Sequence, residues 1–220
     1  LSRVRMPSIP RAADGNGLQE IVNGLKYISL KPIFRLLIAT SFVNAFFGMS
    51  HLILAPILVG MFFGSASGSA VAMLFSMEGV GGVLGAVVGG NLSASGRFKP
   101  HNLIVGGAAM YGVLLVGIAI SPLYALVAIL ELLSSTSNNL FSVIAQTTLQ
   151  TQVTDDFRGR VMGIWSMTYS IMRPFGQLGM GALGNTLNAA VTIGGGGLVV
   201  FVFALIGCGR NDELRSLKNS

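Results

Sequence analysis

The 220-residue sequence is poor in charged residues, histidine and cysteine, and each scarcity excludes a class of protein. Asp, Glu, Lys and Arg together make up 10% of the chain, against about 25% in an ordinary soluble domain. The single cysteine, Cys208, excludes an internal disulfide, and with only His51 and His101 as histidines a metal site built from Cys and His is excluded too. There is no Gly-x-Ser-x-Gly, His-Glu-x-x-His or Walker motif, so nothing indicates an enzyme and we expect no cofactor.

Apolar residues and glycine are abundant instead. Mean hydropathy is +0.72, and the 30 glycines are typical of transmembrane helices, whose backbones approach closely. A helix needs about 20 apolar residues to cross about 30 Å of hydrocarbon. Six stretches are roughly long enough: residues 33–63, 70–92, 103–120, 124–149, 161–183 and 189–206. We therefore predict an all-α, polytopic membrane protein with six transmembrane helices in residues 32–206.

The basic residues predict the orientation of these spans. Apart from Arg173, every Lys and Arg lies before the first span or at its start, in the second or fourth gap, or after the last span. The gaps at 64–69, 121–123 and 184–188 contain no charge. Because cytoplasmic loops retain Lys and Arg, both ends of the chain should be cytoplasmic. The net charge of +6 is the sum of these loops, so we expect lipid headgroups and no nucleic acid as the polyanion.

The segments outside the spans differ in character. Residues 1–17 are rich in Pro, Gly and charge without periodicity, which predicts a cytoplasmic linker, and residues 207–220 form a cytoplasmic tail. The chain opens on Leu1-Ser2-Arg3 without an initiator methionine, so we expect it to begin inside a longer chain. Residues 18–31 predict an amphipathic helix on the membrane surface, with apolar residues at helical spacing. These are Leu18, Ile21, Val22, Leu25 and Ile28.

The polarity of each span predicts what it contacts. The third and sixth spans contain little that is polar beyond Tyr111 and Thr192, so we expect them to face lipid. The second span carries Gly81, Gly85 and Gly89 at four-residue spacing, which gives a flat face for close helix contact.

The fourth span is the polar one. Six consecutive polar residues, 134–139, cover every face of a helix, so this part cannot face lipid. Interhelical hydrogen bonding is one explanation, and a solvated pathway is the other; two asparagines near a carboxylate favour the pathway. The expected cavity-lining residues are Asn44, His51, Ser135, Asn138 and Asn139.

Three ionisable residues, Glu78, Glu131 and Arg173, lie inside spans. At about 1.5 Å per residue, all three lie about 10–15 Å below the outer surface. A lone charge there costs from about 2.5 to over 10 kcal/mol, so such residues pair or face water. One Arg–carboxylate pair leaves the other carboxylate to take up a proton, which suits proton coupling or a cationic substrate. A static ion pair that fixes the helices is the alternative.

Two segments carry a family resemblance. The run Thr154-Asp-Asp-Phe-Arg158-Gly159-Arg160-Val-Met162-Gly163, followed by Pro174-Phe-Gly176, resembles the connection between the tenth and eleventh helices of major facilitator superfamily transporters. It is closest to the enterobactin-exporter and macrolide-efflux branch. Leu25-Lys-Tyr27-Ile28 and Pro32-Ile-Phe-Arg35 resemble the start of the seventh helix.

A third segment departs from the family pattern. The Gly-x-x-x-Asp-Arg-x-Gly-Arg-Lys loop of the family corresponds to Gly90-Asn-Leu-Ser-Ala94-Ser95-Gly96-Arg97-Phe-Lys99, one residue shorter and without the acid and the first base. We therefore expect Gly96, Arg97 and Lys99 only to hold the loop to the neighbouring helices and the lipid headgroups. Asp155, Arg158, Gly159 and Arg160 are the expected residues of the second loop.

The resemblance implies that the spans are helices seven to twelve, the C-terminal half of a twelve-helix transporter, whose N-terminal six-helix half is the expected partner. It implies a secondary active transporter in the bacterial inner membrane, working by alternating access. We expect proton-coupled efflux of a drug-like or siderophore-like small molecule. A permease subunit of an ATP-driven transporter is disfavoured by loops of only about ten residues. A non-transporting scaffold is disfavoured by the polar fourth span and the buried charges.

Overall fold

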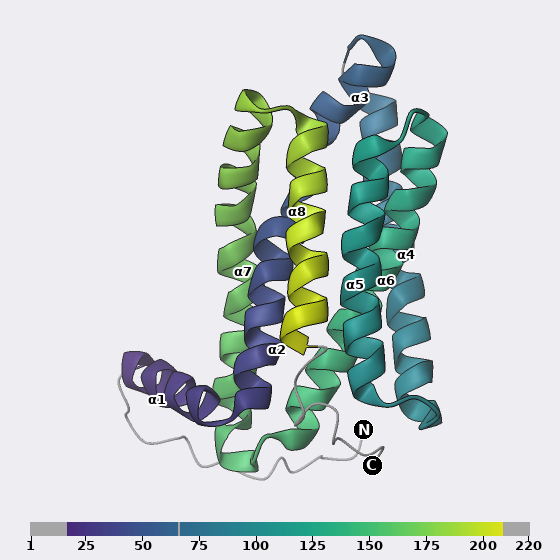
Figure 1. Ribbon diagram of the computed structural model, residues 1–220. Helices are drawn as coiled ribbons and strands as arrows, with labels where there is room; N and C mark the ends of the chain where they lie inside the picture. Colours follow the sequence, from purple (N-terminus) through teal and green to yellow (C-terminus); the bar gives the residue numbers. More distant parts are fainter. Residues whose placement is uncertain (1–16, 66, 209–220) are drawn as a thin grey trace, which may run out of the picture.

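The computed structural model describes residues 17–65 and 67–208, and every regular element within these ranges is helical (Figure 1). This confirms the all-α prediction. The elements are α1 (Gly17–Leu30), α2 (Pro32–Val43), the π-helix η1 (Asn44–Gly48), the 3₁₀-helix η2 (Met49–Leu54), α3 (Ala55–Phe63), α4 (Gly68–Ser95), α5 (Pro100–Ile120), α6 (Tyr124–Gln152), α7 (Asp155–Thr186), α8 (Ala189–Phe203) and the π-helix η3 (Ala204–Cys208). The predicted linker and nearly all of the predicted tail lie outside the described residues.

Among the described residues, five helical segments are long and apolar enough to cross a membrane. They are Pro32–Phe63, Gly68–Ser95, Pro100–Ile120, Tyr124–Gln152 and Ala189–Gly207. The remaining predicted span lies in α7, which runs alongside α2 and α8 but does not meet these criteria among the described residues (Figure 1). Its 32 residues include two acids in the first turn, three arginines and Pro174, and this accounts for its lower apolarity. The chain is therefore a multi-pass helical membrane protein, and six spans remain a prediction.

The first span is not one continuous α-helix. Between α2 and α3 the backbone changes to π-helix over Asn44–Gly48 and to 3₁₀-helix over Met49–Leu54. Glycines of neighbouring helices lie directly against this irregular segment. Gly176 of α7 contacts the Phe46 carbonyl, and a Cβ at Gly196 of α8 would lie only 2.7 Å from the Phe47 carbonyl oxygen. Such π segments often occur at functional sites.

The glycine face predicted for the second span lies against α6. Gly81, Gly85 and Gly89 are all buried. A Cβ at Gly81 would lie 2.9 Å from Ser135 Cβ, and one at Gly85 would lie 2.9 Å from Asn139 Cβ. The two backbones are therefore closer than larger side chains would allow, and this contact brings Glu78, one turn before Gly81, beside α6.

The third span, which we expected to face lipid, exposes only one of its faces. Met110 and Val113 of α5 are exposed, whereas Tyr111 is buried between them. The buried face of α5 contacts both α6 and α8, so that Tyr111 points into the protein. Counting polar residues in the span could not reveal this, because a helix that separates two others exposes only part of its circumference.

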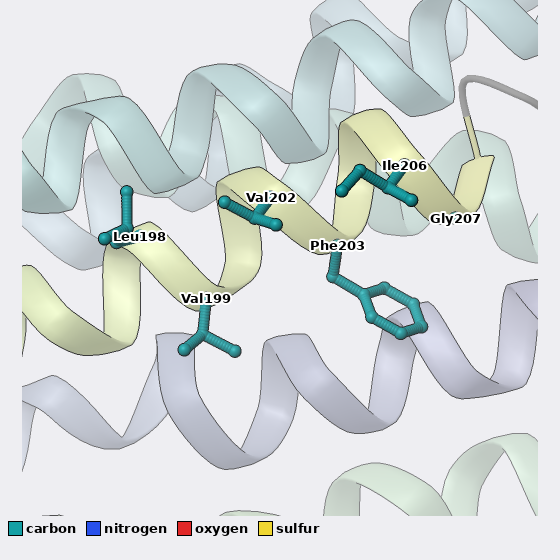
Figure 2. Close-up of a pocket in the computed structure, with 6 residues that line it drawn as sticks. All are labelled: Leu198, Val199, Val202, Phe203, Ile206 and Gly207. Carbon is teal, nitrogen blue, oxygen red and sulfur yellow. The ribbon is translucent and has the colours of Figure 1, made fainter.

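The sixth predicted span does present a wholly apolar surface. A groove of about 450 Å³ lies on α8 and η3. Figure 2 shows the residues that line it: Leu198, Val199, Val202, Phe203, Ile206 and Gly207. These residues offer no polar side chain, so the groove suits lipid acyl chains and not a hydrogen-bonding substrate.

Candidate functional site

The centre of the site is a buried contact between His51 of η2 and Glu131 of α6. His51 Nε2 lies 3.0 Å from Glu131 Oε2 and 3.2 Å from Oε1. His51 is 5% exposed and Glu131 is 2% exposed, so bulk water reaches neither side chain. The other ring nitrogen, Nδ1, lies 2.7 Å from the Gly48 carbonyl oxygen, within the irregular segment.

These contacts define how many protons the pair holds. A carbonyl oxygen only accepts, so Nδ1 must carry a hydrogen, and this tautomer is assigned from the hydrogen-bond network. One further proton then lies between Nε2 and the carboxylate: either imidazolium faces carboxylate, or neutral imidazole faces carboxylic acid. In both cases His51 and Glu131 together are uncharged. Removing that proton leaves two acceptors in contact, which repel each other. A further proton on one carboxylate oxygen leaves the other oxygen to accept from Nε2–H, but it removes the charge attraction between the two side chains.

The second carboxylate, Glu78 of α4, is paired more loosely. Arg173 Nη2 of α7 lies 3.7 Å from Glu78 Oε1, and the two side chains are 37% and 29% exposed. Ser135 Oγ donates to the Glu78 backbone carbonyl at 2.6 Å. Ser50 Oγ of η2 lies 3.4 Å from the Arg173 carbonyl oxygen. The three predicted charges thus lie at one place, with Arg173 beside Glu78 and with His51 beside Glu131.

An asparagine pair adjoins this site. Asn44 Nδ2 donates to Asn138 Oδ1 at 2.9 Å, and both side chains are buried. Asn44 Oδ1 is also buried and has no hydrogen-bond partner. Asn139, by contrast, donates to the Ser135 carbonyl of its own helix and lies against Gly82 of α4. Four of the five expected cavity residues therefore gather here, and Asn139 belongs to the α4–α6 contact.

A small cavity joins these groups. It is lined by Met49, His51, Glu78, Tyr111, Glu131, Ser134, Ser135 and Asn138. Tyr111 and Ser134 were not among the expected site residues. The sequence could have indicated Tyr111 as a site residue, because it is one of very few polar residues in its span. Its burial, however, depends on how α5 is placed. Within the described part of the chain, no group of three or more His, Cys, Asp or Glu is arranged to hold a metal ion.

The loop motifs lie at the opposite end of the bundle from α3 (Figure 1). Arg158 pairs with Asp155 at 2.8 Å, but the two side chains are 52% and 87% exposed. Gly96 ends α4 in the left-handed region with φ of 62°, while Gly90 and Gly159 face open space. In the described ranges no carboxylate lies within 4.0 Å of the charged groups of Arg97 or Lys99.

Arg160 instead connects α7 to α1. Its guanidinium lies 3.7 Å from Glu20 and 5.4 Å from the centre of the Phe157 ring. Tyr27 of α1 stacks on Phe157 with ring centres 4.3 Å apart and nearly parallel planes. Lys31 Nζ lies 5.3 Å from the centre of the Tyr27 ring. An aromatic and cationic contact thus fixes α1 against the first turns of α7.

Comparisons with known proteins bear on the fold. No protein-family model matches the sequence, and no curated protein matches it. Among solved structures, the chain is similar to a mutant of the peptide transporter POT crystallised with sulfate, with a TM-score of 0.72 and 16% sequence identity. The match covers 85% of this chain and 39% of that chain, so this sequence spans about two fifths of the transporter's length. The likeness shows that the chain has a fold similar to part of that transporter.

Proposed function

We propose that this chain is one half of a secondary active transporter and that α7 forms the fifth of its six spans. The similar structure supports the proposal, because the chain matches only part of a longer transporter. The partner is a second six-helix half of the same transporter, and the two halves alternate in exposing a site between them. The family resemblance favours a bacterial inner membrane, and the basic loops favour both chain ends in the cytoplasm.

Proton coupling at Glu131 is the function that the site geometry supports best, and the His51–Glu131 contact is the observation that carries it. A static ion pair would need only opposite charges, such as Glu78 and Arg173. The contact is strongest while His51 and Glu131 share one proton, because loss of that proton leaves two acceptors facing each other and gain of a second removes their charge attraction. A change of protonation therefore favours opening of the contact, and proton movement is thereby tied to alternating access.

The proposed substrate class has two sources of support that differ. The resemblance of the segment around Arg158-Gly159-Arg160 favours efflux of a drug-like or siderophore-like molecule, whereas the similar structure is that of a peptide transporter. A panel of dyes, siderophores and dipeptides separates these possibilities. The test uses the full-length gene product in proteoliposomes with an imposed pH gradient, with and without a protonophore, and with ATP in a parallel sample.

Accumulation that collapses with the protonophore supports the proposal. In Glu131→Gln we expect accumulation at the level of empty liposomes while substrate exchange without a gradient persists. The matched control, Glu20→Gln, removes a half-exposed carboxylate of α1 and should leave accumulation unchanged. Transport that needs ATP and survives the protonophore would instead indicate a permease subunit, and absence of transport for the whole panel would favour a scaffold.

A further inference from the structure

The cavity beside His51 and Glu131 is large enough for one water molecule. Its volume is about 10 Å³. A buried water needs roughly that volume and two to four polar partners. The cavity wall carries polar side chains from three helices: Glu78 of α4, Tyr111 of α5, and Glu131, Ser134 and Asn138 of α6. Apolar cavities stay dry, but this one has the donors and acceptors that hold a water in place.

Both carboxylates line this cavity, and they differ in their access to solvent. Glu131 is 2% exposed, so its carboxylate has no direct contact with bulk water. The Glu78 side chain is 29% exposed. A proton that reaches Glu131 must therefore pass through a group that is itself accessible, and Glu78 is the carboxylate in that position.

We propose that a single water bound in this cavity transfers protons between Glu78 and Glu131, so that Glu78 is the group that loads the buried pair. This inference rests on the proposed proton coupling. The O–H bond of protonated Glu78 breaks as a new bond forms on the water oxygen. One of the water's own O–H bonds then breaks as a bond forms to a Glu131 carboxylate oxygen. Glu78 is left as carboxylate, Glu131 becomes carboxylic acid, and the water is regenerated.

The transfer also explains why the pair would open. Once Glu131 is protonated, its other oxygen can still accept from Nε2–H, but the charge attraction between imidazolium and carboxylate is lost and the contact weakens. The other ionisable groups facing the cavity are Tyr111 of α5 and, through its contact with Glu78, Arg173 of α7. His51 Nδ1 donates a hydrogen bond to the Gly48 carbonyl, so movement of His51 would displace the irregular segment.

The test follows the protonation of Glu131 without needing a substrate. The full-length protein in lipid is subjected to a pH jump, and the carboxylic C=O stretching band that Glu131→Gln removes is recorded over time by infrared spectroscopy. A positioned proton-transfer group contributes about 10²-fold or more to the rate, so Glu78→Gln should slow the rise of this band by about that factor. The final amplitude should be unchanged, because Glu131 and His51 are intact.

Filling the cavity provides an independent variant. Ser134→Thr adds one methyl group at a buried wall of the cavity and should also slow the rise of the Glu131 band. Ser41→Thr is its matched control, since Ser41 is equally buried and its hydroxyl likewise bonds to a carbonyl of its own helix. If Ser134→Thr lowers the amplitude through misfolding, Tyr111→Phe, which removes only a hydroxyl from the wall, replaces it and should slow the band in turn.

The outcomes separate the two proposals. Wild-type rates in Glu78→Gln, or in the cavity variant whose amplitude is preserved, overturn the water relay. If accumulation in the wild type still collapses with the protonophore, proton coupling itself stands. A Glu131 band that does not respond to pH, together with transport that ignores the protonophore, overturns both.

Discussion

Replacing Gly81 with alanine tests the contact that places Glu78 beside α6. The added Cβ would lie 2.9 Å from Ser135 Cβ and would press on the Leu132 carbonyl oxygen, which already accepts a hydrogen bond from Thr136 at 2.8 Å. Carbon atoms in contact normally lie about 3.5–4.0 Å apart, so α4 and α6 would have to separate by roughly 1 Å. Neither contact is with the flexible end of a side chain, and local adjustment cannot remove the overlap.

The magnitude follows from two opposing effects. Overpacking of this kind costs about 1–3 kcal/mol. Alanine in place of glycine in a helix recovers up to about 1 kcal/mol. Gly90→Ala in the same helix is the matched control, because a Cβ there meets nothing within 4 Å and only the gain applies. We therefore expect Gly81→Ala to be less stable than Gly90→Ala by about 1–3 kcal/mol.

Thermal unfolding of the two variants in the same detergent measures this difference. For a domain of about this size, each kcal/mol shifts the midpoint by roughly 2–4 °C. Proton uptake by Glu131 should also change in Gly81→Ala, since Glu78 lies one turn away. Equal midpoints for the two variants would show that α4 and α6 are not in close contact at Gly81, and the position assigned to Glu78 would be wrong.

Two further predictions concern the α1 end of the bundle. Tyr27→Ala removes the stack on Phe157, so α1 should detach more often and trypsin should cut at Lys26 about fivefold faster, since such a pair contributes about 1 kcal/mol beyond its buried area. Tyr27→Phe retains the stack and should resist trypsin like the wild type, and equal cleavage in both variants would refute the docking. Arg158→Ala should change stability by less than about 1 kcal/mol because its ion pair with Asp155 is exposed, and a larger loss on thermal unfolding would show a contact beyond that pair.

Helical spans and the level of the charges are local properties of this sequence. Apolar runs of membrane length must form helices, because only internal hydrogen bonds satisfy a backbone in lipid. Counting residues along each span is then enough to place Glu78, Glu131 and Arg173 at one depth. The structure has a long helix, α7, at the predicted fifth span, but its charged and polar residues leave it outside the candidate spans of the described residues, so this span stays a prediction.

The identity of each pair depends on contacts between distant segments. The shared depth predicts that Arg173 pairs with one of the two carboxylates, but it does not predict whether this is Glu78 or Glu131. The rotation and lateral position of each helix decide that, and they are set by the neighbouring helices. Gly81 against α6 brings Glu78 to the site, and the irregular segment Asn44–Leu54 turns His51 toward Glu131. No local signal predicts that irregularity, since glycines from α7 and α8 are what allow it to be accommodated.

Composition and periodicity therefore specify a helical membrane protein with three charges at one depth. Each span must satisfy its own backbone hydrogen bonds and match the thickness of the bilayer, and it does so independently of the other spans. The assignment of Arg173 to Glu78, of His51 to Glu131, and of Tyr111 to the wall of a shared cavity arises from how the helices approach one another. Those approaches are set by small residues far away along the chain, such as Gly81 against Ser135 and Gly196 against Phe47, and the site forms only when these surfaces come together.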